Sequence, residues 1–233
     1  MSGPSALELA PWPRDDFSAY GEVELRPIPR TQELVGRFLS RNWVCIPHVF
    51  HQDEADISQL EALRKELNAA GTETKLTLLP FVMKALSMLL AEFPQFNTSL
   101  DGEGNLVYKK YFHIGAAVDT PNGLLVPVIR DCDTKSVQSI AAEMAQLADK
   151  ARGRGLSTAD MAGGCMTVSS LGHIGGTGFT PIINAPQVAI LGLTKAVWKQ
   201  IVSAPGEVNY QLRLPLSLSY DHRVIDGAQA ARF

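Results

Sequence analysis

The chain has 233 residues, which is enough for one large domain or two small ones. Hydrophobic residues make up 45% of the sequence and charged residues 19%, a composition typical of a globular protein with a sizeable core. The net charge is −3 and there is no basic run or basic helix face, so nothing here indicates nucleic acid or a membrane surface as a partner.

The first residues differ in character from the rest of the chain. Residues 1–16 are rich in Pro, Ser and Ala, which is typical of the end of a flexible linker, so the folded domain is expected over residues 17–233. A glutamate and several prolines interrupt this segment, and it lacks the apolar centre of a secretory signal. The longest apolar stretch, residues 76–93, contains Pro80 and Lys84 and is too short to cross a bilayer comfortably, so it predicts a buried helix.

Periodicity predicts alternating helices and strands along the first half of the chain. A helix is expected from Thr31, followed by a strand over residues 45–50. The spacing of Ser58 and Glu61 matches a capping box, which predicts a helix that Gly71 closes. Residues 77–93 are apolar on every side, so that helix is expected to be buried on several sides.

The second half of the chain contains more strands. Residues 101–105 separate two short strands, and strands over 113–118 and 124–129 flank a turn at 120–123. Ser136 is placed to cap a helix that continues to Arg152. Further strands are expected at 165–169, 187–201 and 208–220. Because hairpins and helices are interspersed, an α/β fold with a mixed sheet is predicted.

The three cysteines, Cys45, Cys132 and Cys165, are scattered without the spacing of metal ligands. An odd, sparse set of cysteines fits a reducing cytoplasm. None of them lies in a recognisable Cys-His arrangement, so we interpret them as free thiols. His48 and His51 are spaced as on a strand without partner ligands, and no metal site is predicted.

The most informative stretch is residues 221–227, which read Asp-His-Arg-Val-Ile-Asp-Gly. It follows the alternating pattern of residues 214–220, so His222 is expected where a buried strand ends. A free imidazole titrates near neutrality and can accept and return a proton at physiological pH, which suits His222 for a general base. The structural alternative is a histidine that closes a strand.

A glycine-rich loop follows the strand predicted at 165–169. Two hydroxyls, Ser169 and Ser170, stand at the junction of strand and loop, and Gly175, Gly176 and Gly178 would let the chain approach a substrate closely. The run lacks the spacing and the following helix of a phosphate-binding fingerprint. We interpret His173, within the loop, as a structural or rim residue.

Together, residues 163–193 and 221–227 resemble the dihydrolipoamide acyltransferases, the E2 components of 2-oxo acid dehydrogenase complexes. Residues 41–49 and 116–128 also look like motifs of that family, in the same order, and the resemblance runs from Phe17 to the last residue. The sequences of residues 172–176 and 184–186 look most like those of the bacterial family members that transfer acetyl groups in the pyruvate complex. The resemblance implies a chloramphenicol-acetyltransferase-like α/β sandwich in which three subunits pack with an active site at each interface.

The resemblance also assigns roles to individual residues. His222 would be the base that takes a proton from the thiol of coenzyme A or dihydrolipoamide. Ser169 would donate a hydrogen bond to the oxyanion, with Ser170 as the alternative. Asp226 would hold an arginine and shape the site, and Arg30 is the candidate by position, although Asp226 could instead pair with His222 directly.

Substrate contacts are expected at three further residues. Arg41 is a candidate for the coenzyme A phosphates, and its alternative role is a surface ion pair. Leu191 and Leu193 are candidates for the walls of a dihydrolipoamide channel, and their alternative is plain sheet core. Coenzyme A is a substrate, the lipoyl group is expected on a separate domain, and acyl transfer between two thiols needs no metal.

Members of the family continue beyond the equivalent of Phe233 with a terminal helix, and they carry lipoyl and peripheral subunit-binding modules. On this comparison the chain looks like a core domain that lacks the terminal helix. The expected partners are further copies of itself, and pyruvate dehydrogenase (E1) and dihydrolipoamide dehydrogenase (E3) through the missing modules. Two alternatives stay open: the same fold serving another 2-oxo acid complex with a succinyl or branched acyl group, and a scaffold without catalysis.

Overall fold

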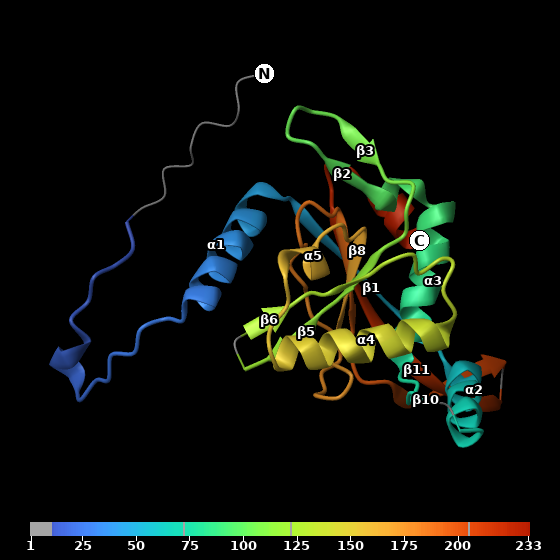
Figure 1. Cartoon of the computed structure of the whole chain (residues 1–233). Coiled ribbons are helices and arrows are strands. Elements are labelled where there is room, and N and C mark those ends of the chain that lie inside the picture. Colours follow the sequence, from blue (N-terminus) through green and yellow to red (C-terminus); the bar gives the residue numbers. More distant parts are fainter. Residues whose placement is uncertain (1–10, 72, 122, 205) are drawn as a thin grey trace.

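The computed structural model describes residues 11–71, 73–121, 123–204 and 206–233. Most of the predicted linker, residues 1–10, and Asn122 of the predicted turn lie outside the described residues. Residues 11–29 are exposed and form no regular element apart from the short 3-10 helix η1, Phe17–Tyr20. Figure 1 shows this segment and the helix after it at one side of the molecule.

The centre of the molecule is a mixed sheet of seven strands in the order β1-β11-β9-β8-β4-β7, with β10 paired to the first part of β11. Strand β8 runs parallel to both β4 and β9, and every other pair in this sheet is antiparallel. The predicted mixed α/β architecture is therefore confirmed. The strands are β1 His48–Asp56, β4 Ile114–Ala116, β7 Val128–Ile129, β8 Met166–Ser170, β9 Ala189–Leu193, β10 Val197–Ala204 and β11 Glu207–Asp221.

Two small two-stranded sheets lie beside the main one. They are β2 Thr98–Leu100 with β3 Leu106–Tyr108, and β5 Val118–Thr120 with β6 Gly123–Leu125. The prediction of single strands over 113–118, 124–129 and 187–201 was wrong, since each is divided in two. Pro127, which has no N–H to give to a ladder, lies at the break between β6 and β7.

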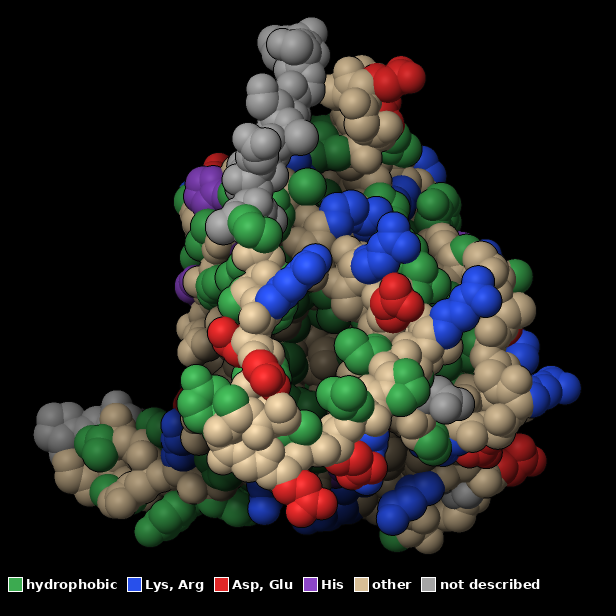
Figure 2. Space-filling model, turned by 90° about the vertical axis from the view of Figure 1, so that its left-hand side faces the viewer, with side chains coloured by type: hydrophobic (Ala, Val, Ile, Leu, Met, Phe, Trp, Pro, Cys, Tyr) green, Lys and Arg blue, Asp and Glu red, His purple; other side chains and the backbone are tan. Residues whose placement is uncertain are grey.

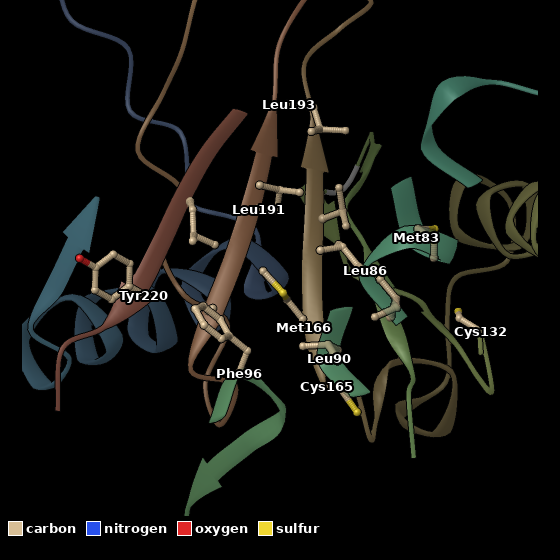
Figure 3. Packing of buried hydrophobic residues seen from close by; sticks show 14 of the residues in the cluster. Met83, Leu86, Leu90, Phe96, Cys132, Cys165, Met166, Leu191, Leu193 and Tyr220 are labelled. Carbon is tan, nitrogen blue, oxygen red and sulfur yellow. The ribbon is translucent and has the colours of Figure 1, made fainter. Parts of the chain in front are cut away.

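Helices α3 and α4 pack against each other and against the sheet, as Figure 1 shows. Met83, Leu86 and Leu90 of α3 meet Met166 and other strand residues in the main core, which Figure 3 shows from close by. This helix was predicted to be buried on several sides; five of its residues are buried, and Met88 is 62% exposed on the remaining side. The helices are α1 Arg30–Cys45, α2 Ser58–Ala69, α3 Leu78–Glu92, η2 Pro94–Asn97, α4 Val137–Arg152, α5 Thr158–Met161 and α6 Gly227–Arg232. No helix among the described residues is long and apolar enough to cross a bilayer.

Two predicted caps have different outcomes. Ser136 caps α4, since its side chain accepts a hydrogen bond from the N–H of Ser139. The capping box at Ser58 was wrong, because α2 already includes Ser58 and has Ile57 at its N-cap. The Ser58 hydroxyl instead donates to Asp56 and accepts from the N–H of Leu212, so it ties the start of α2 to β11.

One side of α1 carries apolar side chains that are largely uncovered in the single chain. Leu34, Phe38 and Leu39 are 49%, 48% and 39% exposed, and Ile28 just before the helix is 67% exposed. Figure 2 shows the side of the molecule on which α1 lies, with hydrophobic side chains at the surface. A row of exposed apolar side chains on one helix is typical of a surface that another protein surface covers.

The C-terminal residues Gly227–Arg232 form the short helix α6. Helix α6 begins directly after Asp226, and Phe233 stacks on Phe96 with ring centroids 4.0 Å apart. The Phe93 ring contacts the Phe233 ring edge-on. These contacts anchor the end of the chain to the core beside α3.

Candidate active site

His222 stands at the start of a tight turn at the end of β11. The backbone N–H groups of Val224 and Ile225 both donate to the carbonyl of Asp221, each at 3.0 Å, and the N–H of His222 donates to the carbonyl of Pro47 at 3.1 Å. The main chain on both sides of His222 is thus fixed, whereas its side chain is exposed. The turn therefore holds the backbone of His222 in place while its imidazole faces the surface.

Asp221 and Arg223, on either side of His222, form an ion pair. The Asp221 side chain is 3% exposed and accepts from Nη2 of Arg223 at 2.6 Å and from Nε at 2.9 Å. The backbone N–H of Arg223 donates to the same carboxylate at 3.0 Å. The carboxylate raises the pKa of the Arg223 guanidinium. Sequence reasoning gave neither residue a role, although an acid and a base two positions apart around a candidate catalytic residue were a usable signal.

Asp226 is the N-cap of α6. Its carboxylate accepts from the N–H of Gln229 at 2.8 Å, and the side chain of Gln229 accepts from the N–H of Asp226 at 3.0 Å, which completes a capping box. Among the described residues, no ion pair joins Asp226 to Arg30, which is exposed at the first position of α1. Within one chain, the arginine paired beside the catalytic candidate is therefore Arg223, and its partner is Asp221.

Ser169 and Ser170 end β8 and, as successive strand residues, point to opposite faces of the sheet. Ser170 stands in register with Leu193, and its hydroxyl accepts from the N–H of Gly172 at 3.4 Å. Ser169 stands in register with Gly192. Both serines are partly exposed, so either hydroxyl can meet a substrate.

The glycine-rich loop after these serines passes close over β9. The ring of Phe179 lies against Gly192, where an added Cβ would be 2.7 Å from the ring, and the N–H of Phe179 donates to Ser217 at 3.4 Å. Gly176 has a φ of +88°, which side chains rarely adopt. The predicted close approach therefore takes place between the loop and its own sheet, and His173 is exposed on the loop as expected of a rim residue.

His222 and the two serines lie at opposite ends of the sheet. Ser170 is in register with Leu193, and Leu193 is in register with Leu216 of β11. His222 is six residues beyond Leu216, about 20 Å at the rise of an extended strand. A reacting group that touches both His222 and a serine at the end of β8 cannot do so within one chain.

A cavity of about 530 Å³ opens beside the turn of His222. Arg41 and Cys45 of α1 line it, together with Asp221 and Arg223. The guanidinium of Arg41 donates to the side-chain oxygen of Asn42 at 2.8 Å and lies over the Phe38 ring. The structure thus brings Arg41 next to the turn of His222, and since Asp221 pairs with Arg223, Arg41 gives the cavity its positive charge.

Leu191 and Leu193 are only 8% and 2% exposed and belong to the main core, as Figure 3 shows. They share that core with Met166 and with Met83 of α3. In the single chain their surroundings are those of plain sheet core, which was the alternative interpretation of both residues.

The remaining histidines and cysteines have structural surroundings. His48 contacts the carbonyl of Ile46 through Nδ1 at 2.9 Å and accepts from the N–H of Ile183 through Nε2 at 3.0 Å. Burial raises the pKa of the Cys132 thiol to about 11 and also raises that of Cys165. Cys45 is exposed, and all three cysteines are free thiols. Within the described ranges, no group of three or more His, Cys, Asp or Glu side chains is placed to hold a metal ion.

Solved structures with this fold include close relatives. One is that of Azotobacter vinelandii dihydrolipoamide acetyltransferase, from a study of a serine, a histidine and an asparagine in its catalytic mechanism. It is 53% identical with a TM-score of 0.92, over 96% of this chain and 93% of that one. The cubic core of a pyruvate dehydrogenase multienzyme complex matches at 52% identity with the same TM-score. A chloramphenicol acetyltransferase at 16% identity and a TM-score of 0.53 shares the fold, which confirms the predicted fold class.

Curated relatives are similarly close. The acetyltransferase components of the pyruvate dehydrogenase complexes of Cupriavidus necator and Pseudomonas aeruginosa are each 54% identical, over 99% and 97% of this chain. The chain spans 42% of the length of each of these two relatives. The model of the 2-oxoacid dehydrogenases acyltransferase catalytic domain matches residues 20–233. The chain therefore belongs to the family of 2-oxoacid dehydrogenase acyltransferase catalytic domains.

Proposed function

We propose that this chain transfers an acetyl group between dihydrolipoamide and coenzyme A and forms the core of a pyruvate dehydrogenase complex. The observation that carries the proposal is the 54% identity over 99% of the chain to an acetyltransferase component, in a chain that presents an exposed His222 from a fixed turn. The free thiols of the three cysteines fit a reducing cytoplasm as the place of this activity.

His222 is the general base of the proposed reaction. It takes the proton from the coenzyme A thiol, and the thiolate attacks the carbonyl of the acetyl thioester on dihydrolipoamide. The tetrahedral intermediate then collapses, the dihydrolipoamide sulfur leaves, and the imidazolium returns the proton to it. Proton transfer of this kind typically contributes about 10² to 10⁴-fold in rate.

A serine at the end of β8 stabilises the oxyanion of that intermediate. In the Azotobacter vinelandii enzyme, the serine studied lies 52 residues before the histidine, and the asparagine four residues after it. In this chain Ser170 lies 52 residues before His222, and Asp226 lies four residues after it. This spacing supports Ser170 as the donor, in place of its neighbour Ser169, and sets Asp226 where that relative has an asparagine.

Each active site is formed between two chains of a trimer. The separation of about 20 Å between His222 and Ser170 in one chain supports this arrangement, because the intermediate must touch both groups. The exposed apolar face of α1 supplies a surface for a neighbour, and a relative at 52% identity forms a cubic core. Trimers that join into a larger particle are therefore the proposed assembly.

Arg41 is the proposed contact for a phosphate of coenzyme A. It lines the cavity beside the turn of His222, and guanidinium groups bind phosphate oxygens well. The acetyl group arrives on a lipoyl group carried by another domain. E1 and E3 are the proposed enzyme partners.

Replacing the proposed base tests the function. We expect His222→Ala to lower kcat for acetyl transfer from acetyl-coenzyme A to free dihydrolipoamide by about 10² to 10⁴-fold, with the assembly unchanged in sedimentation. His173→Ala, on the exposed loop, is the matched control and should keep normal turnover. Near-normal activity of His222→Ala would reject the role of His222, and faster transfer of succinyl or branched acyl groups by the unaltered protein would reject the acetyl assignment.

A further inference from the structure

The turn of His222 is held from a second, distant part of the chain. The side chain of Gln95, in the 3-10 helix η2, donates from Nε2 to the carbonyl of Val224 at 3.0 Å. Val224 is two residues after His222, and its own N–H closes the turn by donating to the carbonyl of Asp221. The Gln95 bond therefore reaches the end of the turn, whereas the bond from the N–H of His222 to Pro47 holds its beginning.

A tyrosine on the β2–β3 hairpin fixes the orientation of Gln95. The hydroxyl of Tyr108, the last residue of β3, donates to Oε1 of Gln95 at 2.6 Å. Because a carbonyl can only accept, the amide nitrogen of Gln95 must face Val224, and its oxygen is then free to accept from Tyr108. The three groups form one directed chain of hydrogen bonds, from Tyr108 through Gln95 to the turn. Figure 1 shows this hairpin beside the C-terminus of the chain.

The support behind Gln95 is rigid, so its bond can define where the turn lies. The next two residues, Phe96 and Asn97, are each 1% exposed. The carbonyl of Gln95 accepts from the hydroxyl of Thr98 at 2.8 Å. The side chain of Asn97 donates to the carbonyl of Lys109 at 3.1 Å, which joins η2 to the hairpin. Buried and hydrogen-bonded neighbours of this kind hold a side chain within narrow limits.

The link itself lies near the surface. Tyr108 is 45% exposed, Gln95 is partly exposed, and both border a small cavity of about 260 Å³. Such a hydrogen bond adds little to the stability of the whole domain, because water competes for both of its partners. Val224, by contrast, is 8% exposed, and a buried carbonyl needs a donor. What the link adds is a fixed position for the turn.

We propose that Gln95 and Tyr108 are positioning residues, whose hydrogen bonds to the Val224 carbonyl hold the turn where the His222 imidazole reaches the thiol. This inference deepens the proposed function and rests on it where turnover is concerned. The two residues act through the backbone of the turn. A displacement of about 1 Å at a reacting group can cost about 10²-fold in rate, so even a partial release of the turn is measurable.

Three substitutions at Gln95 separate the bond from the side chain that makes it. Gln95→Met keeps the length of the side chain but removes donor and acceptor, so kcat for acetyl transfer should fall about tenfold while KM changes less than about twofold. Gln95→Lys keeps an N–H donor for the carbonyl of Val224 and should recover most of the lost turnover. Gln95→Glu keeps the acceptor for Tyr108 but sets a carboxylate against a carbonyl, so it should lose at least as much turnover as Gln95→Met.

The hydroxyl of Tyr108 tests whether the two residues act as a chain. Tyr108→Phe removes only the second bond and should lower kcat by about three- to fivefold. Adding it to Gln95→Met should cause no further loss, because Tyr108 acts through Gln95, whereas two independent contributions would multiply. Gln146→Met, at an exposed position of α4, is the matched control for the replacement of a glutamine and should keep normal turnover.

The hold on the turn can be measured without any assay of activity. Amide hydrogen exchange over residues 222–225, followed by mass spectrometry of the assembled protein, should quicken about fivefold in Gln95→Met and stay close to normal in Gln95→Lys. Exchange over α4 is the internal control and should not change in either variant.

The outcomes separate the inference from the proposed function. Lower turnover and faster exchange of the turn in Gln95→Met, both recovered by Gln95→Lys, support the inference. Turnover within about twofold of normal in Gln95→Met, or a loss that Gln95→Lys shares, overturns it. Exchange that quickens over α4 as much as over the turn also overturns it, since this would mean a general loss of stability. Undiminished turnover in His222→Ala would instead reject the proposed function, and exchange of the turn would then decide alone whether Gln95 holds it.

Discussion

At the scale of single residues, His222 and the serines at the end of β8 differ in how firmly hydrogen bonds hold them. The backbone around His222 is fixed by the bonds to Asp221 and Pro47, and its ring is left exposed. Ser170 is held more loosely, by one hydrogen bond of 3.4 Å from Gly172. A hydroxyl with a weak partner can turn toward charge that develops in a transition state at little cost.

Replacing each serine by alanine and comparing kcat should show which of the two donates to the oxyanion. If Ser170 donates to the oxyanion, Ser170→Ala should lower kcat by about 10² to 10³-fold with little change in KM, because the contact exists only in the transition state. Ser169→Ala is the matched control and should change kcat by less than tenfold. The reverse result would assign the donor to Ser169, and full activity in both variants would exclude a serine hydroxyl from this role.

The three cysteines should differ sharply in reactivity. The thiolate is the form that reacts with disulfide reagents, and burial raises the pKa of Cys132 to about 11 and that of Cys165 above its ordinary value. At pH 8 we therefore expect Cys132 and Cys165 to resist an aromatic disulfide reagent in the folded protein, while all three thiols react after denaturation. Labelling of Cys132 as fast as in the denatured chain would contradict the burial of that thiol.

At the scale of elements, helix α6 links the turn that carries His222 to the core. Its first residues depend on the reciprocal bonds of Asp226 and Gln229, and its end places Phe233 against Phe96. The cap needs an oxygen acceptor and not a charge, because asparagine and aspartate are comparable N-caps. This offers a structural reason why an asparagine can occupy the position of Asp226 in a relative.

Substitutions at Asp226 should separate the cap from the charge. Asp226→Ala removes the acceptor, at a cost of about 1 kcal/mol to the local stability of α6, so amide exchange of residues 229–233 should quicken about fivefold. Asp226→Asn keeps the acceptor and should leave exchange close to that of the unaltered protein. If Asp226→Asn speeds exchange as much as Asp226→Ala, the charge of Asp226 is essential and the capping account is wrong.

The sequence predicted those elements whose signals are local. The strand expected at 208–220 appears as β11, Glu207–Asp221, and the helix expected over 77–93 appears as Leu78–Glu92, because alternation and apolar runs are read over a few neighbouring residues. Ser58 failed as a cap because its hydroxyl is bound to Leu212, which lies far away in the sequence. No local pattern carries such a contact.

In the candidate site, too, local patterns predicted some features, whereas others depend on the three-dimensional structure. His222 could be singled out from its motif, but the choice between Ser169 and Ser170 depends on which face of the sheet meets the substrate. Arg30 was proposed as the partner of Asp226 from sequence position, whereas the pair that forms beside His222 joins Asp221 and Arg223. Which charged groups pair is decided by side-chain directions at the end of β11, and a motif does not specify these.

At the scale of the whole molecule, the sheet separates the proposed base from the proposed oxyanion donor by most of the length of β11. On the proposed function, a single chain contains two incomplete half-sites, His222 at one end and Ser170 at the other. In a closed ring of identical chains, each chain can offer its histidine to one neighbour and its serine to the other, and every interface is then equivalent. The exposed apolar side chains of α1 are available to be covered in such a ring.

Mixed assemblies provide a direct test of shared sites. One chain carries His222→Ala, and a second carries both Ser169→Ala and Ser170→Ala; each alone should be nearly inactive. If a site takes its histidine from one chain and its serine from the next, random mixing at equal amounts should restore roughly a quarter of normal activity, because half the chains supply each intact group. Mixtures prepared without subunit exchange, from separately assembled particles, are the control and should stay inactive. Co-expressed mixtures that remain as inactive as the two parents, although mass measurement shows both chains in one particle, would mean that His222 and its serine act within the same chain.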